Sequence, residues 1–142
     1  MPLPDSERVV HAVCSDAFEA SSGECSLELY QGKNVSVSRL EVTPLPQQWR
    51  VLAATVQKLP GRKLERLSEL GVGQLISTAR NYRPREKPEG FILSVEEDGT
   101  PKNRAHAEIR GNISKGLSRQ LVGIHLLHTP PDGFDAESIP RI

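Results

Sequence analysis

Apolar and polar residues alternate in several short segments of this chain, which is the spacing of a β-strand with one face toward a core. The clearest case lies in residues 34–42, where Val35 and Val37 alternate with Ser36 and Ser38. Other segments are rich in β-branched or alternating apolar residues and end at glycine, proline or polar clusters. Strands are therefore predicted over residues 8–13, 34–42, 71–79, 90–96 and 105–110.

Two longer segments have apolar residues at steps of three and four, as on one face of an amphipathic helix. The first covers residues 47–59 and ends at a Pro-Gly pair. The second begins after Ser114, whose hydroxyl can cap a helix N-terminus, and ends near His125 to His128. Leucine recurs every third residue in 62–70, which predicts one shorter helical segment there.

Strands and helices follow one another without a regular βαβ repeat, and this order favours an α+β fold over a doubly wound parallel sheet. We expect a single α+β domain over residues 1–142, with a mainly antiparallel sheet covered on one face by two to three helices. The helices over 47–59 and 114–125 are expected to cover the sheet. Residues 1–7 and 130–142 are expected to be less ordered.

Lys plus Arg and Asp plus Glu both number 18, so the formal net charge is zero. A chain without a positive surplus has no overall attraction for a nucleic-acid backbone, so a nucleic-acid partner is not favoured. Near-zero charge also leaves little colloidal repulsion, which favours a protein partner or a homo-oligomer. The sequence shows neither a signal-peptide pattern nor an apolar run approaching the ~20 residues of a membrane span. We therefore expect a cytoplasmic protein with no membrane partner.

Neither the cysteines nor the C-terminal histidines form a recognisable metal or nucleophile motif. Cys14 and Cys25 are the only cysteines, and their spacing is no CxxC pattern. Asp16 lies beside Cys14 and would raise the pKa of that thiol rather than activate it. His125 and His128 are three residues apart, which is a weak signal for a metal site when no carboxylate or third histidine lies nearby. The same spacing fits cations at a helix C-terminus. No metal and no cofactor are therefore predicted.

The densest group of polar residues is 98–112, a turn that runs into an alternating strand. His106 is its strongest candidate for chemistry, because Asn103 precedes it and Glu108 shares its strand face roughly 7 Å away. Such a histidine could act as a general base or bind a phosphate or carboxylate group. The alternative is an exposed or hydrogen-bonded histidine with a structural role only.

Two further candidates lie on other predicted strands. His11 would converge with His106 if the two strands share a sheet; otherwise it is a histidine at the edge of the core, satisfied by the backbone. Arg39 continues the buried register of Val37, so it needs a carboxylate inside the protein or an anionic ligand. A bulge that turns Arg39 to solvent is the alternative.

Three blocks of the sequence form a recurring pattern: Arg8-Val-Val-His-Ala-Val13, Val35-Ser-Val-Ser-Arg39 and Lys102-Asn-Arg-Ala-His-Ala-Glu-Ile-Arg-Gly111. Together they resemble a group of small stand-alone bacterial proteins of unassigned function that carry Leu-Ser-Val-x-Arg and Asn-x-Ala-His-Ala motifs. This chain departs from the group in having Val35 for the leucine and in lacking an aromatic residue after Ser21-Ser22. The resemblance implies a cytoplasmic bacterial protein and points to Arg39, Asn103 and His106. It implies no activity.

Two classes of function follow. The first is a small cytoplasmic bacterial accessory or binding protein that acts through a protein partner, favoured because no complete catalytic set is recognisable. The second is a small enzyme, or a nucleotide- or anion-binding protein, with a site built from His106, Arg39, Asn103 and His11. There Arg39 would hold an anionic group, His106 would move a proton and Asn103 would orient the ligand. One concave pocket lined by these residues would favour the second class, and scattered positions would oppose it.

Overall fold

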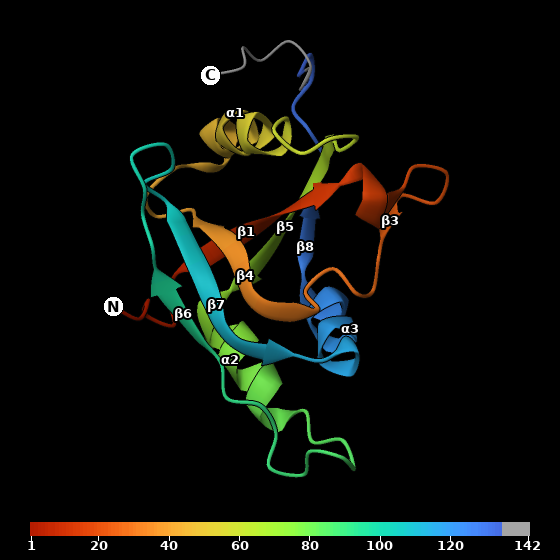
Figure 1. The fold of residues 1–142 in the computed structure, drawn as a ribbon, viewed down its shortest axis with the longest axis vertical. Coiled ribbons are helices and arrows are strands. Elements are labelled where there is room, and N and C mark those ends of the chain that lie inside the picture. The colour runs from red at the N-terminus through yellow and green to blue at the C-terminus, as the bar shows by residue number, and fades with distance from the viewer. Residues whose placement is uncertain (135–142) are drawn as a thin grey trace.

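A six-stranded antiparallel sheet with the strand order β6-β7-β4-β1-β5-β8 organises the chain (Figure 1). The computed structural model describes residues 1–134. The strands of this sheet are β1 (Arg8–Cys14), β4 (Gly32–Arg39), β5 (Leu64–Gly71), β6 (Ser94–Glu97), β7 (His106–Ile113) and β8 (Leu126–His128). A small second sheet pairs β2 (Phe18–Glu19) with β3 (Glu24–Cys25), after the short 3-10 helix Ser15–Ala17. The helices are α1 (Leu45–Val56), α2 (Val72–Asn81) and α3 (Lys115–Ile124).

The predicted single α+β domain with a mainly antiparallel sheet is confirmed, and two helices, α2 and α3, share one face of the sheet. Val9 of β1 and Leu70 of β5 belong to the same buried cluster as Leu75 of α2 and Leu117 of α3. The expectation that the 47–59 helix lies on this same face was wrong. That segment forms α1 on the other side of the same two strands, because successive strand residues point to opposite faces. There Trp49 and Ala53 pack with the second cluster, which contains Val10, Leu64 and Leu67. In Figure 1, α1 accordingly lies at the opposite end of the molecule from α2.

The predictions for residues 62–70 and 71–79 were wrong, because the first segment is strand β5 and the second is helix α2. Strand β5 lies between two cores, with Leu67 in one cluster and Leu70 in the other. A strand buried on both faces shows no alternation, so its leucines at three-residue steps imitate a helix. In the next segment Val72, Leu75 and Ala79 are buried at helical spacing.

The chain after residue 114 begins as predicted and ends differently. The Ser114 hydroxyl accepts a hydrogen bond from Leu117 N at 3.1 Å, so Ser114 caps α3. The helix stops at Ile124, and the segment predicted to end it forms strand β8 beside β5. The Thr-Pro-Pro sequence that follows limits β8 to three residues.

The N-terminal residues, predicted to be less ordered, lie along the edge of the sheet. Leu3 is buried, and its backbone N–H donates to the Val95 carbonyl at 2.8 Å. Pro2 forms a bridge to Glu96. Residues 1–7 thus cover part of the open edge of β6. The same prediction was made for residues 130–142, of which residues 135–142 lie outside the described part of the chain.

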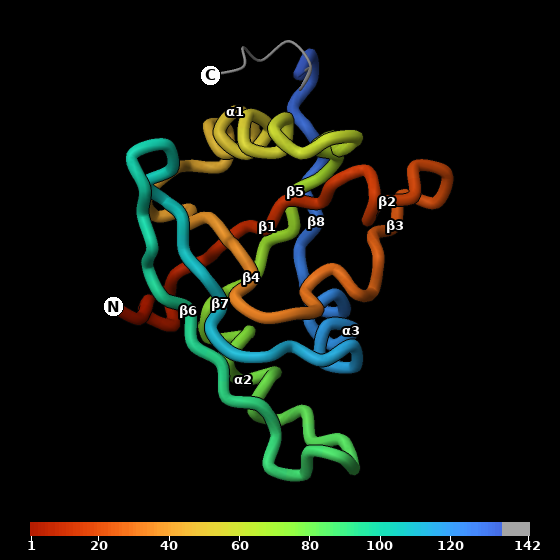
Figure 2. Tube along the Cα trace, in the orientation of Figure 1, coloured from red at the N-terminus to blue at the C-terminus, as the bar shows by residue number. Residues whose placement is uncertain are grey.

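Strands β1 and β4 separate after a very short contact. They are paired only at Val9 with Arg39 and at Val10 with Ser38. Strand β1 then continues along β5 as far as Cys14, whereas β4 follows β7 in the other direction (Figure 2). The opening between the two strands is where the candidate site lies.

Trp49 is the largest side chain of the cluster under α1, and its ring lies 5.7 Å from that of Phe134. We expect Trp49→Ala to lower the free energy of unfolding by about 3–5 kcal/mol, because it leaves a cavity between α1 and the sheet. Denaturant titration measures this change. Ile92→Ala is the control, since Ile92 is 90% exposed, and it should change stability by less than about 0.5 kcal/mol. Equal effects of the two substitutions would contradict the assigned core.

Candidate functional site

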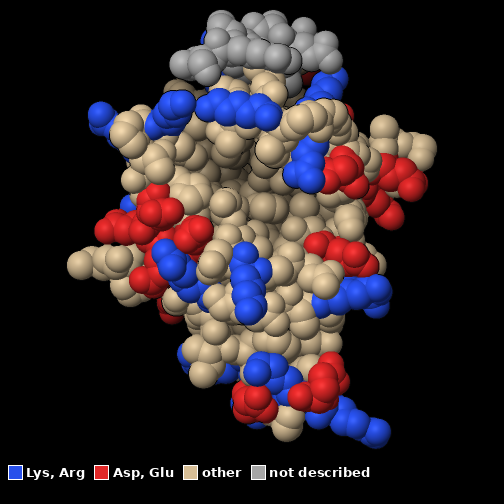
Figure 3. All heavy atoms as spheres, viewed as in Figure 1, with Lys and Arg blue, Asp and Glu red and all other residues tan. Residues whose placement is uncertain are grey.

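A cleft of about 680 Å³ lies between α1, the separating strands β1 and β4, and the loop that joins β6 to β7. Leu52, Val56 and Leu59 form its apolar wall. The opposite wall carries polar side chains, and the lining there includes Ser36, Asn103 and His106. Figure 3 shows this region as a hollow of mostly uncharged residues below α1, with Lys and Arg side chains along its upper edge.

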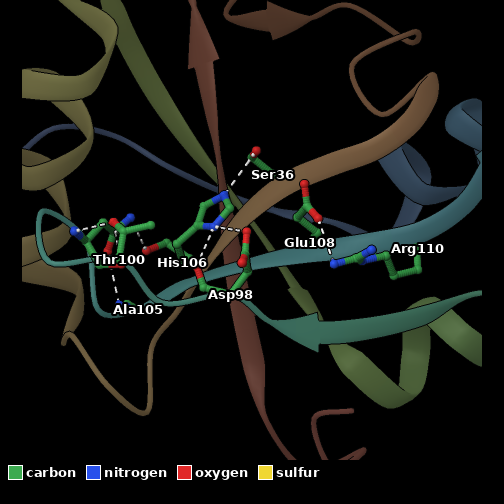
Figure 4. A network of polar contacts seen from close by, with 9 residues as sticks. Ser36, Asp98, Thr100, Ala105, His106, Glu108 and Arg110 are labelled. Carbon is green, nitrogen blue, oxygen red and sulfur yellow. Dashed lines mark hydrogen bonds and ion pairs between the residues drawn. The ribbon is translucent and has the colours of Figure 1, made fainter. Parts of the chain in front are cut away.

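His106 is held at both ring nitrogens (Figure 4). Its Nδ1 lies 2.9 Å from the backbone oxygen of Asp98 and 3.2 Å from the carboxylate of the same residue. Its Nε2 lies 3.2 Å from the Ser36 hydroxyl. Ser36 and His106 are diagonal neighbours, because Ser38 is the residue paired with His106 across β4 and β7. The antiparallel register of these strands therefore sets this contact.

The partners of His106 also determine where its proton lies. Both groups near Nδ1 are oxygens of Asp98, and neither the carbonyl nor an ionised carboxylate can donate. Nδ1 of the neutral ring therefore carries the hydrogen. Nε2 is left with a lone pair and accepts the hydrogen bond of the Ser36 hydroxyl.

Asn103 lies in the same cleft wall and fixes the loop that carries it. Its Oδ1 accepts a hydrogen bond from Ala105 N at 3.1 Å, and its Nδ2 lies 3.5 Å from the Ser38 hydroxyl. Backbone bonds in both directions between Thr100 and Asn103 close the turn. Asn103 thus reaches the cleft from a loop that is tied at both ends to the sheet.

His11 occupies the opening between β1 and β4. Its Nδ1 donates to the Ser36 carbonyl at 2.6 Å, and its ring lies 5.1 Å from the Tyr30 ring at an angle of 35°. Burial lowers the pKa of His11, and the carbonyls of Ser36 and Leu29 offset this only in part. His11 therefore stays neutral at pH 7. It lines the cleft with His106, and both histidines contact Ser36.

Arg39 does not line the cleft. Its Nε and one terminal nitrogen each lie 2.9 Å from an oxygen of Glu7, and the other terminal nitrogen lies 3.4 Å from Glu97. Arg39 and Ser38 are adjacent on β4, so their side chains point to opposite faces of the sheet. Their pairing with Val9 and Val10 on β1 follows the same alternation. The partner required by its buried register is thus a carboxylate inside the protein. Of the four predicted site residues, the cleft brings together His106, Asn103 and His11.

Basic side chains lie at the edge of the cleft, beside or among the residues that line it. Lys58 follows α1 and Lys102 lies in the β6–β7 loop, and the pKa of Lys58 is lowered because the two ammonium groups lie close together. Arg62 lines the cleft and pairs with Asp16 at 3.5 Å, with both side chains about half exposed. These three cations come from segments that the fold brings to one edge.

A second polar chain ends at Tyr30, whose ring contacts His11. Cys25 Sγ lies 3.8 Å from Nε2 of His125, whose Nδ1 lies 2.7 Å from the Ser68 hydroxyl. Ser68 in turn lies 2.6 Å from the Tyr30 hydroxyl. Burial raises the pKa of Cys25 and lowers that of His125, so this thiol and imidazole are neutral. Their geometry is that of an internal hydrogen-bond network.

The C-terminal histidines, considered as neighbours on one helix, have separate partners. His128 lies 2.8 Å from Glu69, which also accepts a hydrogen bond from Arg8. Burial alone would raise the pKa of Glu69, but these two partners outweigh it and the pKa is lowered.

Within residues 1–134, no group of three or more His, Cys, Asp or Glu is placed to hold a metal ion. The pKa of Cys14 is raised by its burial and, as predicted, by Asp16.

Sequence reasoning missed Ser36 and Asp98. The sequence predicts Ser36 only as a solvent-facing or cross-strand hydroxyl opposite Val35 and Val37, and Asp98 only as the start of a turn. Only the pairing of β4 with β7 places Ser36 diagonally beside His106. The signal that could have found Asp98 is its position eight residues before His106, across a turn with Gly99 and Pro101.

Comparison of the chain with family models, with curated proteins and with solved structures found no match. The resemblance to small stand-alone bacterial proteins therefore stays a prediction. Within residues 1–134, no helix combines the length and the apolar character needed to cross a membrane.

We expect Arg39→Met to lower the free energy of unfolding by about 3 kcal/mol, because the buried Glu7 carboxylate loses both of its hydrogen bonds. Arg39→Lys should restore only part of this loss, since an ammonium group cannot replace the two-pronged contact. Urea titration measures both variants. Lys115→Met, at an exposed ion pair with Glu28, is the control and should change stability by less than about 1 kcal/mol. A loss at Arg39 no larger than the loss at Lys115 would contradict the structural role.

The neutral state of His11 predicts a loss of stability on acidification. Below the ordinary histidine pKa of ~6.5, the unfolded chain binds a proton that the folded His11 does not. The stability that neutral His11 contributes is therefore fully present above the unfolded-state pKa of ~6.5. It is lost as the pH falls from there through the lower pKa of His11 in the folded protein. Each unit of lowering corresponds to about 1.4 kcal/mol. His11→Gln should flatten the fall in stability between pH 7 and 5, measured by urea titration at each pH. An unchanged slope in the variant would refute this assignment.

Proposed function

We propose that the protein binds a small molecule with an anionic group in the cleft beside His106. The observation that carries this proposal is an open cleft in which His106 is already fixed in orientation and tautomer by Asp98 and Ser36. A side chain held in this way can recognise a ligand without first losing conformational freedom. This is the second class of function considered for the sequence, with Arg39 removed from the site.

The size and lining of the cleft support a small-molecule ligand. A volume of about 680 Å³ falls in the range of roughly 300–1,000 Å³ that is typical of such sites. Leu52, Val56 and Leu59 offer apolar surface to one side of the ligand. The Ser36 hydroxyl, oriented by His106, and the Asn103 amide offer directed polar groups to the other side. An apolar wall that faces a few oriented polar groups is the usual composition of a binding pocket.

The cations at the cleft edge support an anionic group on the ligand. Lys58 and Lys102 repel one another, as the lowered pKa of Lys58 indicates, and an anion between them would relieve that repulsion. Arg62 is paired with Asp16 only at 3.5 Å and at the surface, where such pairs contribute little. A carboxylate or phosphate group of the ligand could therefore replace Asp16 beside Arg62.

The other class, a cytoplasmic bacterial accessory protein that acts through a protein partner or as a homo-oligomer, stays a prediction. Its support is the near-zero net charge and the sequence resemblance. The described surface offers the cleft as a built concave site, which is why ligand binding is placed first.

A thermal-shift series tests the proposal. The probes are inorganic phosphate, nucleoside monophosphates and short-chain carboxylates, each compared with an uncharged isostere. We expect an anionic probe to raise Tm; a ligand at 100 times its Kd adds about 2.7 kcal/mol of stability. The shift should disappear in His106→Ala and weaken in a Lys58→Ala/Lys102→Ala variant.

Ile92→Ala, at an exposed position that does not line the cleft, is the matched control and should keep the full shift. If no anionic probe raises Tm, or if the shift survives in His106→Ala, the cleft is not the ligand site. A protein that co-purifies with the chain in that case would favour the accessory class.

A further inference from the structure

We propose that the cleft is also a catalytic site for acyl transfer, with Ser36 as the nucleophile, His106 as the general base and Asp98 as the group that orients His106. The substrate class is a small carboxylic ester that carries an anionic group. This inference rests on the proposed function, because the ester would occupy the same cleft.

Three side chains from separate segments lie in one line of polar contacts, and the hydrogen bond of His106 Nδ1 itself goes to the Asp98 backbone oxygen (Figure 4). Ser36 lies in the middle of β4, Asp98 directly follows β6 and His106 begins β7. The Ser36 hydroxyl lies 3.2 Å from His106 Nε2, and the Asp98 carboxylate lies 3.2 Å from His106 Nδ1. A nucleophile in contact with a base, and a base oriented by a third group, is the arrangement that activates a serine hydroxyl.

The protonation of this line suits catalysis. Because Asp98 holds the hydrogen of His106 on Nδ1, the free lone pair of Nε2 faces the hydroxyl whose proton must be removed. When Nε2 takes that proton, His106 becomes positively charged beside the Asp98 carboxylate, which stabilises the new charge. The side chain of His106 is 22% exposed and that of Asp98 is 50% exposed, so water screens part of this interaction and the main role of Asp98 is to orient the ring.

Accessibility separates Ser36 from the other serine that contacts a histidine. The Ser68 hydroxyl lies closer to its histidine, at 2.7 Å from His125, but Ser68 is fully buried and also contacts Tyr30. No substrate can reach it there. Ser36 is exposed and lines the cleft. Ser38, two residues along the same strand face, is fully buried.

Asn103 is the donor that we assign to the oxyanion of the reaction. It lines the cleft with Ser36, and its Nδ2 makes one contact, at 3.5 Å to Ser38, which leaves a second N–H on the same nitrogen. Its Oδ1 already serves to hold the loop through Ala105. A fixed amide donor near a developing oxyanion stabilises the transition state.

The reaction has two balanced halves. Ser36 Oγ attacks the carbonyl carbon of the ester and forms an O–C bond, while its proton passes to His106 Nε2. The tetrahedral oxyanion then re-forms the carbonyl, the bond to the leaving alcohol oxygen breaks, and His106 returns the proton to that oxygen. Water attacks the acyl-Ser36 ester and gives a proton to His106. The Ser36 O–C bond breaks, the carboxylic acid leaves and Ser36 regains its proton.

The cleft lining narrows the substrate class. The wall of Leu52, Val56 and Leu59 fits a short aliphatic acyl chain. Lys58 and Lys102, which lie close together and directly precede the lining residues Leu59 and Asn103, fit a carboxylate or phosphate on the leaving alcohol. We therefore expect short-chain esters with an anionic leaving group to react faster than uncharged esters of equal size.

The test is covalent labelling with an alkyl fluorophosphonate, which reacts with activated serines, followed by peptide mass spectrometry. We expect the label on Ser36 and on no other described serine. Hydrolysis of p-nitrophenyl acetate and butyrate gives the rate. Labelling and hydrolysis should disappear in Ser36→Ala and fall by about 10²–10⁴-fold in His106→Ala. Asn103→Asp keeps the Oδ1 acceptor but replaces the donor, and it should lower kcat by at least about 10²-fold.

Ser77→Ala is the control, at an exposed serine of α2 that does not line the cleft, and it should keep both labelling and hydrolysis. If the folded wild-type protein takes no label and hydrolyses neither ester, the catalytic proposal is overturned. An intact Tm shift with an anionic probe in that protein would show that ligand binding stands without catalysis. If the label appears on Ser36 while no anionic probe shifts Tm, the triad stands and the anionic ligand fails.

Discussion

The early separation of β1 from β4 is the constraint on which the site depends. After two residue pairs the strands part, and the His11 ring spans the opening by donating to the Ser36 carbonyl. Without that hydrogen bond the Ser36 carbonyl and the His11 imidazole would each lose a partner, which would lower the stability of the fold. The same opening forms the floor of the cleft, so a backbone contact of Ser36 stabilises the fold while its hydroxyl faces outward to His106.

The two hydrophobic clusters divide the sheet unequally. Helices α2 and α3 pack against one face of the central strands, whereas α1 packs against Val10 and Leu67 on the other face. The part of β4 and β7 that carries Ser36 and His106 lies beside this helix-covered region and remains accessible. An exposed strand face next to a packed helix combines a rigid scaffold with access for a ligand, as a binding site requires.

The four histidines show how environment assigns different roles to one residue type. His11 bridges two strands as a neutral donor, and His125 belongs to an internal network with Ser68 and Cys25. His128 pairs with Glu69, a carboxylate whose pKa is lowered by its partners although burial opposes this. His106 alone among them joins a carboxylate on one side to an exposed hydroxyl on the other. That asymmetry is the reason for placing proton transfer there.

Local sequence patterns were enough to predict the elements that bury a single face. The alternation around Val37, the cap at Ser114 and the three-to-four spacing of residues 47–59 each predicted an element of the correct type. The sequence also marked His106 and Asn103, because a dense polar turn before a strand is visible without coordinates. Local periodicity failed for β5 and α2, since a strand buried on both sides has no polar face to reveal its period.

Which side chains meet depends on how the strands pair and pack in the complete fold. Arg39 and His106 both followed from their strands as candidates, but the pairing of β4 with β1 and β7 sends one to Glu7 and the other to Ser36. A shift of one residue in the pairing of β4 would move Arg39 to the face that now carries Ser36, and Ser36 to the opposite face. The register of strands far apart in the chain depends on the packing of both cores, and no short stretch of sequence contains that information.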